Sequence, residues 1–511
     1  MDIVARHART QPEAVALVCD EQSLTWAQWD RIKNKFANAL TATGVGVGER
    51  VVTYLHNGLE RFVVTAACDA LGLTHVPLNW HLAAPEVAHI LHDCDARVVV
   101  FDSEFDAVVA AVTPETAAVS SWIRVASERW GSDDFADCYA GADDKAPERL
   151  GPGSGTIIYT SGTTGMPKGA FREPQRRAGD EMKTLLAAVI AEMDMRFDDA
   201  HLVAGPLYHS APGFWASLGV GMGRKLVIQR RYDPAEALRL IEEHAVGDTF
   251  MAPLLVKRLV ELPDDIWAEA DTSSLHSLVM AGAPCPFAVK ERVRERLGNV
   301  LYEFYGATEL SVATLLKPEE QLVKPGSCGR AFPGVELAVF DDEGFKVRAG
   351  ETGTLHVRRN VLTIDGYYGR PGAFEETATG DWLTVGDVAY LDDDGYVFIC
   401  DRKVDMIISG GVNIYPAEIE SALHGHAAVA DVCVFGIPDD DWGESVHAVV
   451  ELREGAELDA DEMVAWCDGR LARYKVPRSV EFVTHLPRDA AGKLAKRTLR
   501  DPHWAAAERV I

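Results

Sequence analysis

Residues 159–169 read Tyr-Thr-Ser-Gly-Thr-Thr-Gly-Met-Pro-Lys-Gly and gather hydroxyls, glycines and one lysine into a short segment. Its glycines lack the Cβ atoms that would keep backbone N–H groups from turning toward a ligand, and its hydroxyls add neutral donors. Lys168 supplies the one positive charge. These residue types predict a clamp for a polyphosphate, whose members are Thr160, Ser161, Gly162, Thr163, Thr164, Gly165 and Lys168.

Two other interpretations of this segment exist. Clusters of Gly, Ser and Thr are common in ordinary polar turns. A Walker-type P-loop requires Gly directly before the lysine and Ser or Thr directly after it, whereas Pro167 and Gly169 stand there. The spacing therefore disfavours a P-loop kinase or GTPase, and the choice between clamp and turn depends on the rest of the chain.

Further segments carry side chains capable of chemistry, and each follows a strand-like run. Taken singly, a lone histidine or an exposed carboxylate in such a place is most often structural or solvated. The segments are 205–213 with Tyr208 and His209, 280–284 with Gly282, 301–309 with Tyr305 and Glu309, 381–387 with Asp387, 400–420 with Arg402, and 486–493 with Lys493.

Together and in this order, these segments resemble the motifs of the adenylate-forming superfamily. That superfamily comprises acyl-CoA synthetases, the adenylation domains of peptide synthetases and firefly-type luciferases. The resemblance covers nearly the whole chain, and the wording of the motifs is most similar to bacterial fatty-acid and bile-acid CoA ligases. It favours the clamp over the turn.

The resemblance implies a role for each motif residue. Catalysis would depend on Lys493, Thr308, Glu309 and His209, and Glu309 would hold Mg²⁺. Adenine and ribose would contact Gly282, Ala283, Pro284, Glu303, Tyr305, Gly306, Asp387 and Arg402. The acyl pocket would contain Tyr208, His209, Phe214, Trp215 and Gly219, and coenzyme A would contact Ser409, Gly410, Gly411, Trp442, Arg473 and Lys475.

The implied activity is that of an ATP-dependent acyl-CoA ligase. A carboxylic acid and ATP would give acyl-AMP and pyrophosphate, and the thiol of coenzyme A would then give acyl-CoA and AMP. The aromatic residues of the pocket favour a bulky apolar acid, whether fatty, alicyclic or polycyclic like a steroid or terpenoid. The alternatives are a stand-alone adenylating enzyme that loads a carrier protein, a luciferase-like oxygenase, and a partner protein that binds acyl-AMP or CoA without adenylating.

Three departures from the family pattern keep the non-adenylating alternative open. Val385 stands where many members have Thr, and Val404 occupies the hinge position that is Asp or Lys in many relatives. Ala490 and Ala491 replace the commoner Pro-Thr before the terminal lysine.

A chain of 511 residues exceeds one compact core, so two to four domains are expected. Strand-like and helical segments alternate through 51–101, the rhythm of a parallel sheet. The resemblance implies an α/β fold: a large N-terminal domain of parallel and mixed sheets with flanking helices (1–400), a hinge (401–405) and a small mobile α+β C-terminal domain (406–511). Residues 120–153, rich in Asp, Gly, Ser and Pro, are expected to form an irregular connector.

The net charge of -28 argues against binding to nucleic acid or to anionic membranes. Residues 201–223 contain no Asp, Glu, Lys or Arg, but their prolines and glycines argue against a membrane span. The nine cysteines form no Cys-x-x-Cys pair and the N-terminus lacks the apolar core of a signal peptide, which indicates a reducing, cytoplasmic setting. The sequence leaves the oligomeric state open, a homodimer included.

Overall fold

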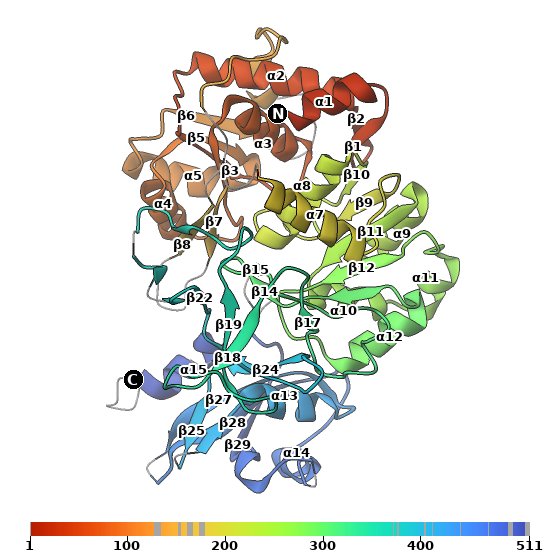
Figure 1. Cartoon of the computed structure of the whole chain (residues 1–511), viewed down its shortest axis with the longest axis vertical. Coiled ribbons are helices and arrows are strands. Elements are labelled where there is room, and N and C mark those ends of the chain that lie inside the picture. Colours follow the sequence, from red (N-terminus) through yellow and green to blue (C-terminus); the bar gives the residue numbers. More distant parts are fainter. Residues whose placement is uncertain are drawn as a thin grey trace.

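Figure 1 shows the computed structural model of the chain. The structure describes residues 2–126, 134–151, 155–160, 167–172, 179–370, 372–375, 378–402, 405–410, 412–439, 441–468, 470–488 and 494–505. Several predicted site residues lie outside these ranges: Ser161, Gly162, Thr163, Thr164, Gly165, Val404, Gly411, Ala490, Ala491 and Lys493.

The first part of the chain forms a four-stranded parallel sheet, as the alternation of strands and helices predicts. Valine-rich segments make its central strands, and nearly all of their residues are buried. The strand order is β4-β3-β5-β6, with β3 (Arg50–Tyr54), β4 (Thr74–Pro77), β5 (Ala96–Asp102) and β6 (Ser121–Val125). Helices α3 (Leu59–Leu71) and α4 (Ala84–Asp93) connect its strands.

A seven-stranded sheet lies beside it and is parallel except for β2. Its order is β13-β12-β11-β9-β10-β1-β2, with β1 (Val15–Cys19), β2 (Gln22–Thr25), β9 (Ala200–Val203), β10 (Leu226–Ile228), β11 (Val246–Met251), β12 (Ser277–Met280) and β13 (Leu301–Glu303). The helices that accompany this sheet are α1 (Ile3–Thr10), α2 (Trp26–Ala42), α7 (Asp180–Glu192), α8 (Ser210–Met222), α9 (Pro234–His244), α10 (Pro253–Val260), α11 (Asp264–Glu269) and α12 (Phe287–Leu297). Helix α5 (Asp106–Val112) packs beside α4, and α6 (Asp134–Tyr139) packs beside β6 of the four-stranded sheet.

Smaller antiparallel sheets complete the N-terminal part. A six-stranded sheet contains β18 (Leu337–Phe340), β19 (Gly353–Arg358), β21 (Ala378–Thr379), β22 (Trp382–Leu383), β23 (Asp387–Leu391) and β24 (Val397–Arg402). A three-stranded sheet contains β7 (Ile157–Thr160), β8 (Lys168–Phe171) and β20 (Gly366–Tyr367). Two-stranded pairs join β14 (Gly306–Ala307) to β15 (Ser311–Val312) and β16 (Thr314–Leu315) to β17 (Arg330–Ala331).

The C-terminal residues form an α+β unit in the lower part of Figure 1, with an apolar core drawn from residues after 406. Its sheet contains β25 (Ile407–Ser409), β26 (Val412–Ile414), β27 (Val429–Asp439), β28 (Gly443–Leu452) and β29 (Ser479–Val483). Helices α13 (Pro416–His424), α14 (Ala460–Trp466) and α15 (Lys496–Ala505) accompany it. The expected α/β class, with a large N-terminal part and a smaller C-terminal part, is confirmed, while the bounds of the hinge stay a prediction.

The expectation of an irregular connector over 120–153 was wrong in part. Residues 121–125 extend the parallel sheet as β6, and α6 packs on α2 through Phe135, whose ring centroid lies 5.0 Å from that of Phe36. These elements are too short to give a periodic pattern, and the sheet edge and neighbouring helix that stabilise them come from earlier residues.

The charge-free segment 201–223 divides between β9 and α8, which are separated by a loop. None of the helices in the described parts of the chain is long and apolar enough to cross a membrane.

A buried ion cluster ties the strands of the seven-stranded sheet together. Asp248 on β11 accepts hydrogen bonds from Arg224 and, at 2.6 Å, from His201 Nδ1. The three side chains are almost wholly buried. Burial alone would raise the pKa of Asp248, but its interactions with His201 and Arg224 outweigh burial and hold that pKa below its usual value.

Replacing Asp248 with alanine should destabilise the fold by about 3–5 kcal/mol, because the Arg224 charge would remain buried without its carboxylate. Urea unfolding measures this loss. The matched control is Glu236→Ala, which removes one carboxylate from the exposed Arg239 pair at 2.7 Å and should cost less than about 1 kcal/mol. Similar small losses in both variants would contradict the role of the buried cluster.

Candidate active site

The two ends of the predicted phosphate clamp lie on paired strands. Strands β7 and β8 are antiparallel, with Thr160 opposite Lys168. A Cβ at position 169 would lie 2.6 Å from Ile157 Cγ2, so the close approach of these strands requires Gly169. The strand pair places Thr160 and Lys168 opposite each other at one end, and the predicted donors at 161–165 lie outside the described residues.

This strand pair is anchored to the parallel sheet through Asp93 at the end of α4. The Tyr159 hydroxyl donates to Asp93 Oδ2 at 2.7 Å, and Arg370 Nη2 donates to Asp93 Oδ1 at 3.1 Å. One carboxylate therefore fixes both the strand that enters the clamp and the segment after β20.

Tyr367 lies between the clamp lysine and the predicted metal ligand. Strand β20 pairs with β8, placing Tyr367 opposite Ala170. The Lys168 ammonium lies 5.5 Å from the centre of the Tyr367 ring, and the Tyr367 hydroxyl donates to Glu309 Oε1 at 3.0 Å. Burial, with the nearby Glu309, raises the pKa of Tyr367, so its hydroxyl stays a donor.

Thr308 and Glu309 are held against the start of α8. The Ser210 and Thr308 hydroxyl oxygens lie 3.0 Å apart, and Arg172 Nη2 donates to the Thr308 carbonyl at 2.8 Å. Since Ser210 directly follows His209, the contact between Ser210 and Thr308 brings the backbone at the predicted catalytic histidine close to Thr308. The Thr308 hydroxyl and the Glu309 carboxylate are hard oxygen donors of the kind Mg²⁺ prefers, so these residues fit the implied ion.

Tyr208, His209 and Phe214 lie at the start of α8, close in sequence to Ser210. The Tyr208 ring is buried and meets Trp80 edge-on at 4.6 Å. His209 caps the N-terminal end of α8, its ring 4.4 Å from that of Tyr208, and Phe214 is half-buried one turn further along.

Two other residues predicted for the acyl pocket lie in the core behind it. Trp215 is 1% exposed and stacks on Phe250 with ring centroids 6.3 Å apart. Gly219 packs against Leu226, which a Cβ would approach to 2.7 Å. The acyl-pocket prediction therefore depends on Tyr208, His209 and Phe214.

Three of the predicted ribose and adenine residues meet at the start of β23. The Tyr305 hydroxyl donates to Asp387 Oδ2, and Asp387 is 7% exposed. Asp387 stands opposite Arg402 in the ladder between β23 and β24. The structure therefore brings the backbone of Arg402 to the same place as Asp387 and Tyr305.

The other residues predicted to contact adenine lie in separate elements. Gly282, Ala283 and Pro284 form an exposed turn after β12, and Gly306 lies in β14. Glu303 instead forms a buried ion pair with Lys290. Burial raises the pKa of Glu303, although Lys290 opposes the shift. Its carboxylate is thus already engaged by Lys290.

The predicted coenzyme A residues lie on the C-terminal unit. The Gly410 N–H donates to the Trp442 carbonyl at 2.8 Å, and the Arg478 guanidinium lies 4.8 Å from the centre of the Trp442 ring, which is 47% exposed. Ser409 ends β25 beside them. Arg473 is exposed, whereas Lys475 donates to Glu418 at 2.6 and 2.7 Å.

The segment that carries Lys493 has fixed ends. Arg488 and Leu494 form an antiparallel bridge, so this segment starts and finishes at adjacent points. Arg488 pairs with Asp431 on β27, and Lys496 pairs with Glu420 at 3.0 Å.

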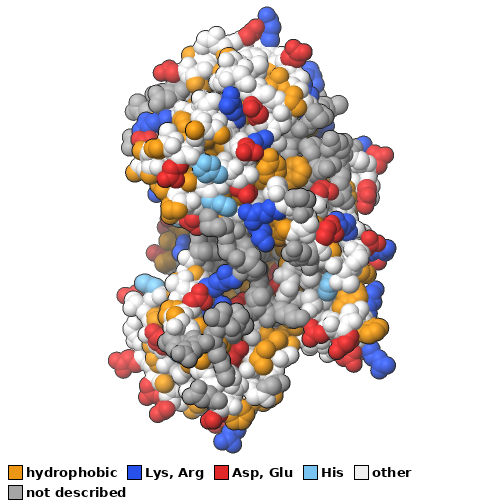
Figure 2. All heavy atoms as spheres, turned by 90° about the vertical axis from the view of Figure 1, so that its left-hand side faces the viewer, with side chains coloured by type: hydrophobic (Ala, Val, Ile, Leu, Met, Phe, Trp, Pro, Cys, Tyr) orange, Lys and Arg blue, Asp and Glu red, His pale blue; other side chains and the backbone are white. Residues whose placement is uncertain are grey.

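These ion pairs belong to a wider pattern. The basic residues of 470–500 largely meet acidic residues of 401–439, and on the face shown in Figure 2 acidic and basic side chains are interspersed rather than gathered by sign. The local excess of positive charge in the sequence is therefore much reduced in the fold.

Sequence reasoning missed four residues that position this site: Tyr367, Asp93, Ser210 and Arg172. Each acts through a partner far away in the chain; Tyr367, for example, is 58 residues from Glu309. The Gly-Tyr-Tyr run at 366–368, next to a short strand, is the one local signal that points to any of them.

The chain belongs to the family of AMP-binding enzymes. The family model described as "AMP-binding enzyme" matches residues 4–368, and "AMP-binding enzyme C-terminal domain" matches 418–493. The sequence resemblance to the adenylate-forming superfamily is thereby confirmed.

Similar proteins of known name are acid–thiol ligases. The chain is 36% identical over 501 residues to a feruloyl-CoA synthase of an Amycolatopsis species, covering 97% of each chain. It is 33% identical over 515 residues to the fatty acid–[acyl-carrier-protein] ligase ScoC of Streptomyces coeruleorubidus, covering 99% and 96%. It also resembles the crystal structure of ATP-bound MatB from Rhodopseudomonas palustris, with a TM-score of 0.88, 27% identity and 99% coverage of both chains. Within its family the chain is an AMP-forming acid–thiol ligase.

The Tyr367→Phe variant should weaken the site at Glu309 without disturbing the fold, because it removes a hydroxyl that donates to that carboxylate while keeping the ring beside Lys168. We expect ATP–pyrophosphate exchange at limiting Mg²⁺ to fall about 10-fold or more. Exchange assays over a range of Mg²⁺ concentrations measure the effect.

Tyr368→Phe is the matched control, since the Tyr368 ring packs on Phe171 and should be insensitive to the change. Unaltered Mg²⁺ dependence in Tyr367→Phe would show that the hydroxyl does not position Glu309.

Proposed function

We propose that this protein is an ATP-dependent acyl-CoA ligase for a bulky, largely apolar carboxylic acid. One observation carries the proposal: the fold gathers Lys168, Tyr367, Glu309 and Thr308 beside the Tyr208-His209 step. These residues supply a phosphate-binding cation, hard oxygen ligands and an aromatic pocket wall at one place.

The first half-reaction joins two anions. The carboxylate oxygen attacks the α-phosphorus of ATP, an O–P bond forms, and the bond to pyrophosphate breaks. Such a reaction needs positioning and charge neutralisation more than proton transfer. Lys168 and the clamp donors hold the β- and γ-phosphates, and Lys493 neutralises the carboxylate and the α-phosphate oxygens as they approach.

The nucleotide is oriented by the cluster at β23. Asp387 accepts hydrogen bonds from the ribose hydroxyls, Tyr305 stacks on adenine, and Arg402 contacts the ribose or phosphate. Tyr305 donates to Oδ2 of Asp387 in this structure, and the carboxylate retains further acceptor positions for the ribose hydroxyls. When bound at Glu309 and Thr308, Mg²⁺ supplies charge neutralisation for the phosphates.

The second half-reaction uses the C-terminal unit differently. The thiol of coenzyme A attacks the acyl carbon, a C–S bond forms, and the bond to AMP breaks. The 401–405 hinge rotates the Lys493 segment away and brings Ser409, Gly410 and Gly411 to the pantetheine arm. Trp442 and Arg473 contact the adenine and phosphates of coenzyme A.

The proposed acid is large because the lining residues that face the site are aromatic. Phe214 is half-buried, and behind it Tyr208 packs against Trp80, so aromatic rings back this side of the site. The names of the feruloyl-CoA and fatty-acid relatives support an aromatic or long aliphatic acid.

A second candidate is a stand-alone adenylating enzyme that loads a carrier protein. The similarity to a fatty acid–[acyl-carrier-protein] ligase favours it. Such an enzyme shares the first half-reaction and differs in the thiol that receives the acyl group.

The Lys493→Ala variant should reduce acyl-AMP formation by roughly 10²–10³-fold, the cost of one lost charge-stabilising donor. It should spare thioester formation from supplied acyl-AMP, because the lysine has left the site by then. The two half-reactions are assayed separately by pyrophosphate exchange and by thioester release.

Arg497→Ala removes an exposed cation four residues further on and should change neither half-reaction. If Lys493→Ala lost both half-reactions equally, the proposal that the C-terminal unit rotates between the two half-reactions would be refuted.

A panel of carboxylic acids, scored for AMP release with and without coenzyme A, tests the acid class and the acceptor together. We expect AMP release with aryl-propenoic or medium-to-long-chain acids, little with acetate, and strong stimulation by CoA. Pyrophosphate exchange without a CoA thioester would favour carrier-protein loading. Binding of acyl-AMP without any exchange would favour a non-adenylating partner.

A further inference from the structure

His447 occupies an unusual place in the C-terminal sheet, outside the candidate active site. It lies in the middle of β28 with a side chain that is 6% exposed. Its Nδ1 is 2.6 Å from the hydroxyl oxygen of Ser479, the residue opposite it on β29. This bond fixes the orientation of the imidazole ring and directs Nε2 away from the strand pair.

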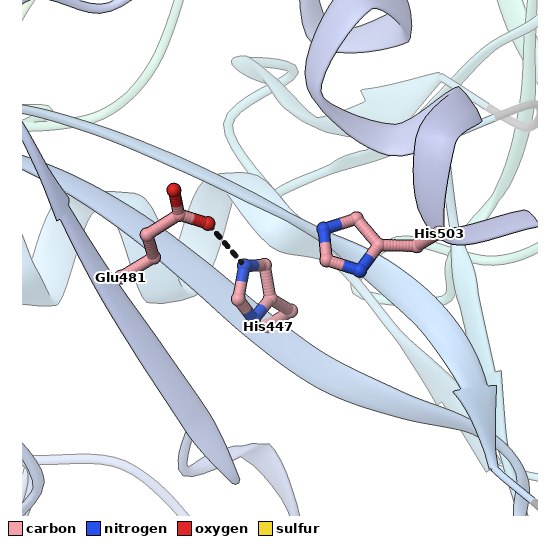
Figure 3. Close-up of side chains that lie close together, drawn as sticks. All are labelled: His447, Glu481 and His503. Atoms are coloured by element: carbon pink, nitrogen blue, oxygen red, sulfur yellow. Dashed lines mark ion pairs between the residues drawn. The ribbon is translucent and has the colours of Figure 1, made fainter.

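Two other side chains that can bind a metal converge on that nitrogen (Figure 3). Glu481 lies two residues after Ser479, so its side chain leaves the same face of β29, and its Oε2 is 3.8 Å from His447 Nε2. His503 approaches from α15, with its ring centroid 5.0 Å from that of His447. One ligand atom from each of the three side chains lies within 4.8 Å of the other two.

The buried nitrogen has no hydrogen bond within the described structure. His447 Nε2 is shielded from solvent, and the Glu481 oxygen is too far away to accept a hydrogen bond. A buried polar atom in a native protein normally has a partner, and here a carboxylate and a second imidazole face the position where that partner would stand. A cation satisfies all three groups at once.

The bond to Ser479 leaves Nε2 as the imidazole atom that faces Glu481 and His503. When Nδ1 carries the ring proton and donates it to the Ser479 hydroxyl oxygen, the lone pair of the neutral ring lies on Nε2.

We propose that His447, Glu481 and His503 form a binding site for a divalent transition-metal ion of the Zn²⁺ type. Two imidazoles and one carboxylate are ligands that zinc accepts, while Ca²⁺ and Mg²⁺ prefer oxygen alone. Ligand atoms around tetrahedral zinc are roughly 3.4 Å apart. A small movement of the exposed Glu481 and of His503 would bring their ligand atoms to this distance from His447 Nε2. Water fills the fourth position on the solvent side.

The ion would fasten the C-terminal helix to the sheet. His503 is the one ligand from α15, whereas the other two come from adjacent strands. Helix α15 begins at Lys496, shortly after Lys493. Metal binding would thus stabilise helix α15, which directly follows the Lys493 segment in the chain.

Zinc binding is tested by isothermal titration of the full chain after treatment with a chelator. A Cys138→Ser background removes an exposed thiol that could bind zinc itself. The parent should bind one Zn²⁺ per chain, and Glu481→Gln and His503→Gln should each bind at least 10-fold more weakly. His485→Ala, which removes a histidine that is 83% exposed and outside the group, should bind like the parent.

Hydrogen exchange provides an independent readout. Zn²⁺ should slow amide exchange in residues 496–505 of the parent and of His485→Ala, and leave exchange unchanged in His503→Gln. Binding of equal affinity in all variants, no binding in the parent, or binding without protection of α15 would each overturn the proposal. Because Glu481 is exposed, Glu481→Gln tests the site even if His447 variants fail to fold.

Discussion

The pairing of β8 with β20 is the contact on which the candidate active site depends. The two strands come from distant parts of the chain and are joined through backbone bonds, among them Asp365 N–H to the Phe171 carbonyl at 2.9 Å and Tyr368 N–H to the Gly169 carbonyl at 2.8 Å. This ladder sets the distance between the clamp lysine and Glu309. Since displacements of about 1 Å can cost 100-fold in rate, a backbone ladder is a suitable device for holding two such groups.

Charge in this protein is balanced over long distances in the sequence. Residues 470–500 are strongly basic in a chain of net charge -28. In the fold, Lys475, Arg488 and Lys496 each meet an acidic residue from 401–439. The positive potential that the C-terminal unit presents to an anionic ligand is therefore smaller than its local composition indicates. Exposed cations such as Arg473 provide most of what remains.

The motifs in the sequence indicated the family and supplied the proposed site residues, whereas the contacts that position those residues depend on packing and could not be predicted. The order of the motifs indicated the family, and the β-branched runs indicated the parallel strands. Trp215 and Gly219 were assigned to the pocket with Phe214, but successive helix residues are rotated by about 100°, and their direction depends on where the sheet lies. Tyr367 was missed because its partner, Glu309, becomes a neighbour only after β8 and β20 pair.

The ladder between β23 and β24 joins Asp387 to Arg402, which lies within the predicted hinge at 401–405. A rotation that begins after Arg402 would twist the strand pair that holds the proposed ribose ligand. Nucleotide binding and the orientation of the C-terminal unit would then be thermodynamically coupled. If a bound nucleotide stabilises one orientation by a given free energy, that orientation binds the nucleotide more tightly by the same free energy.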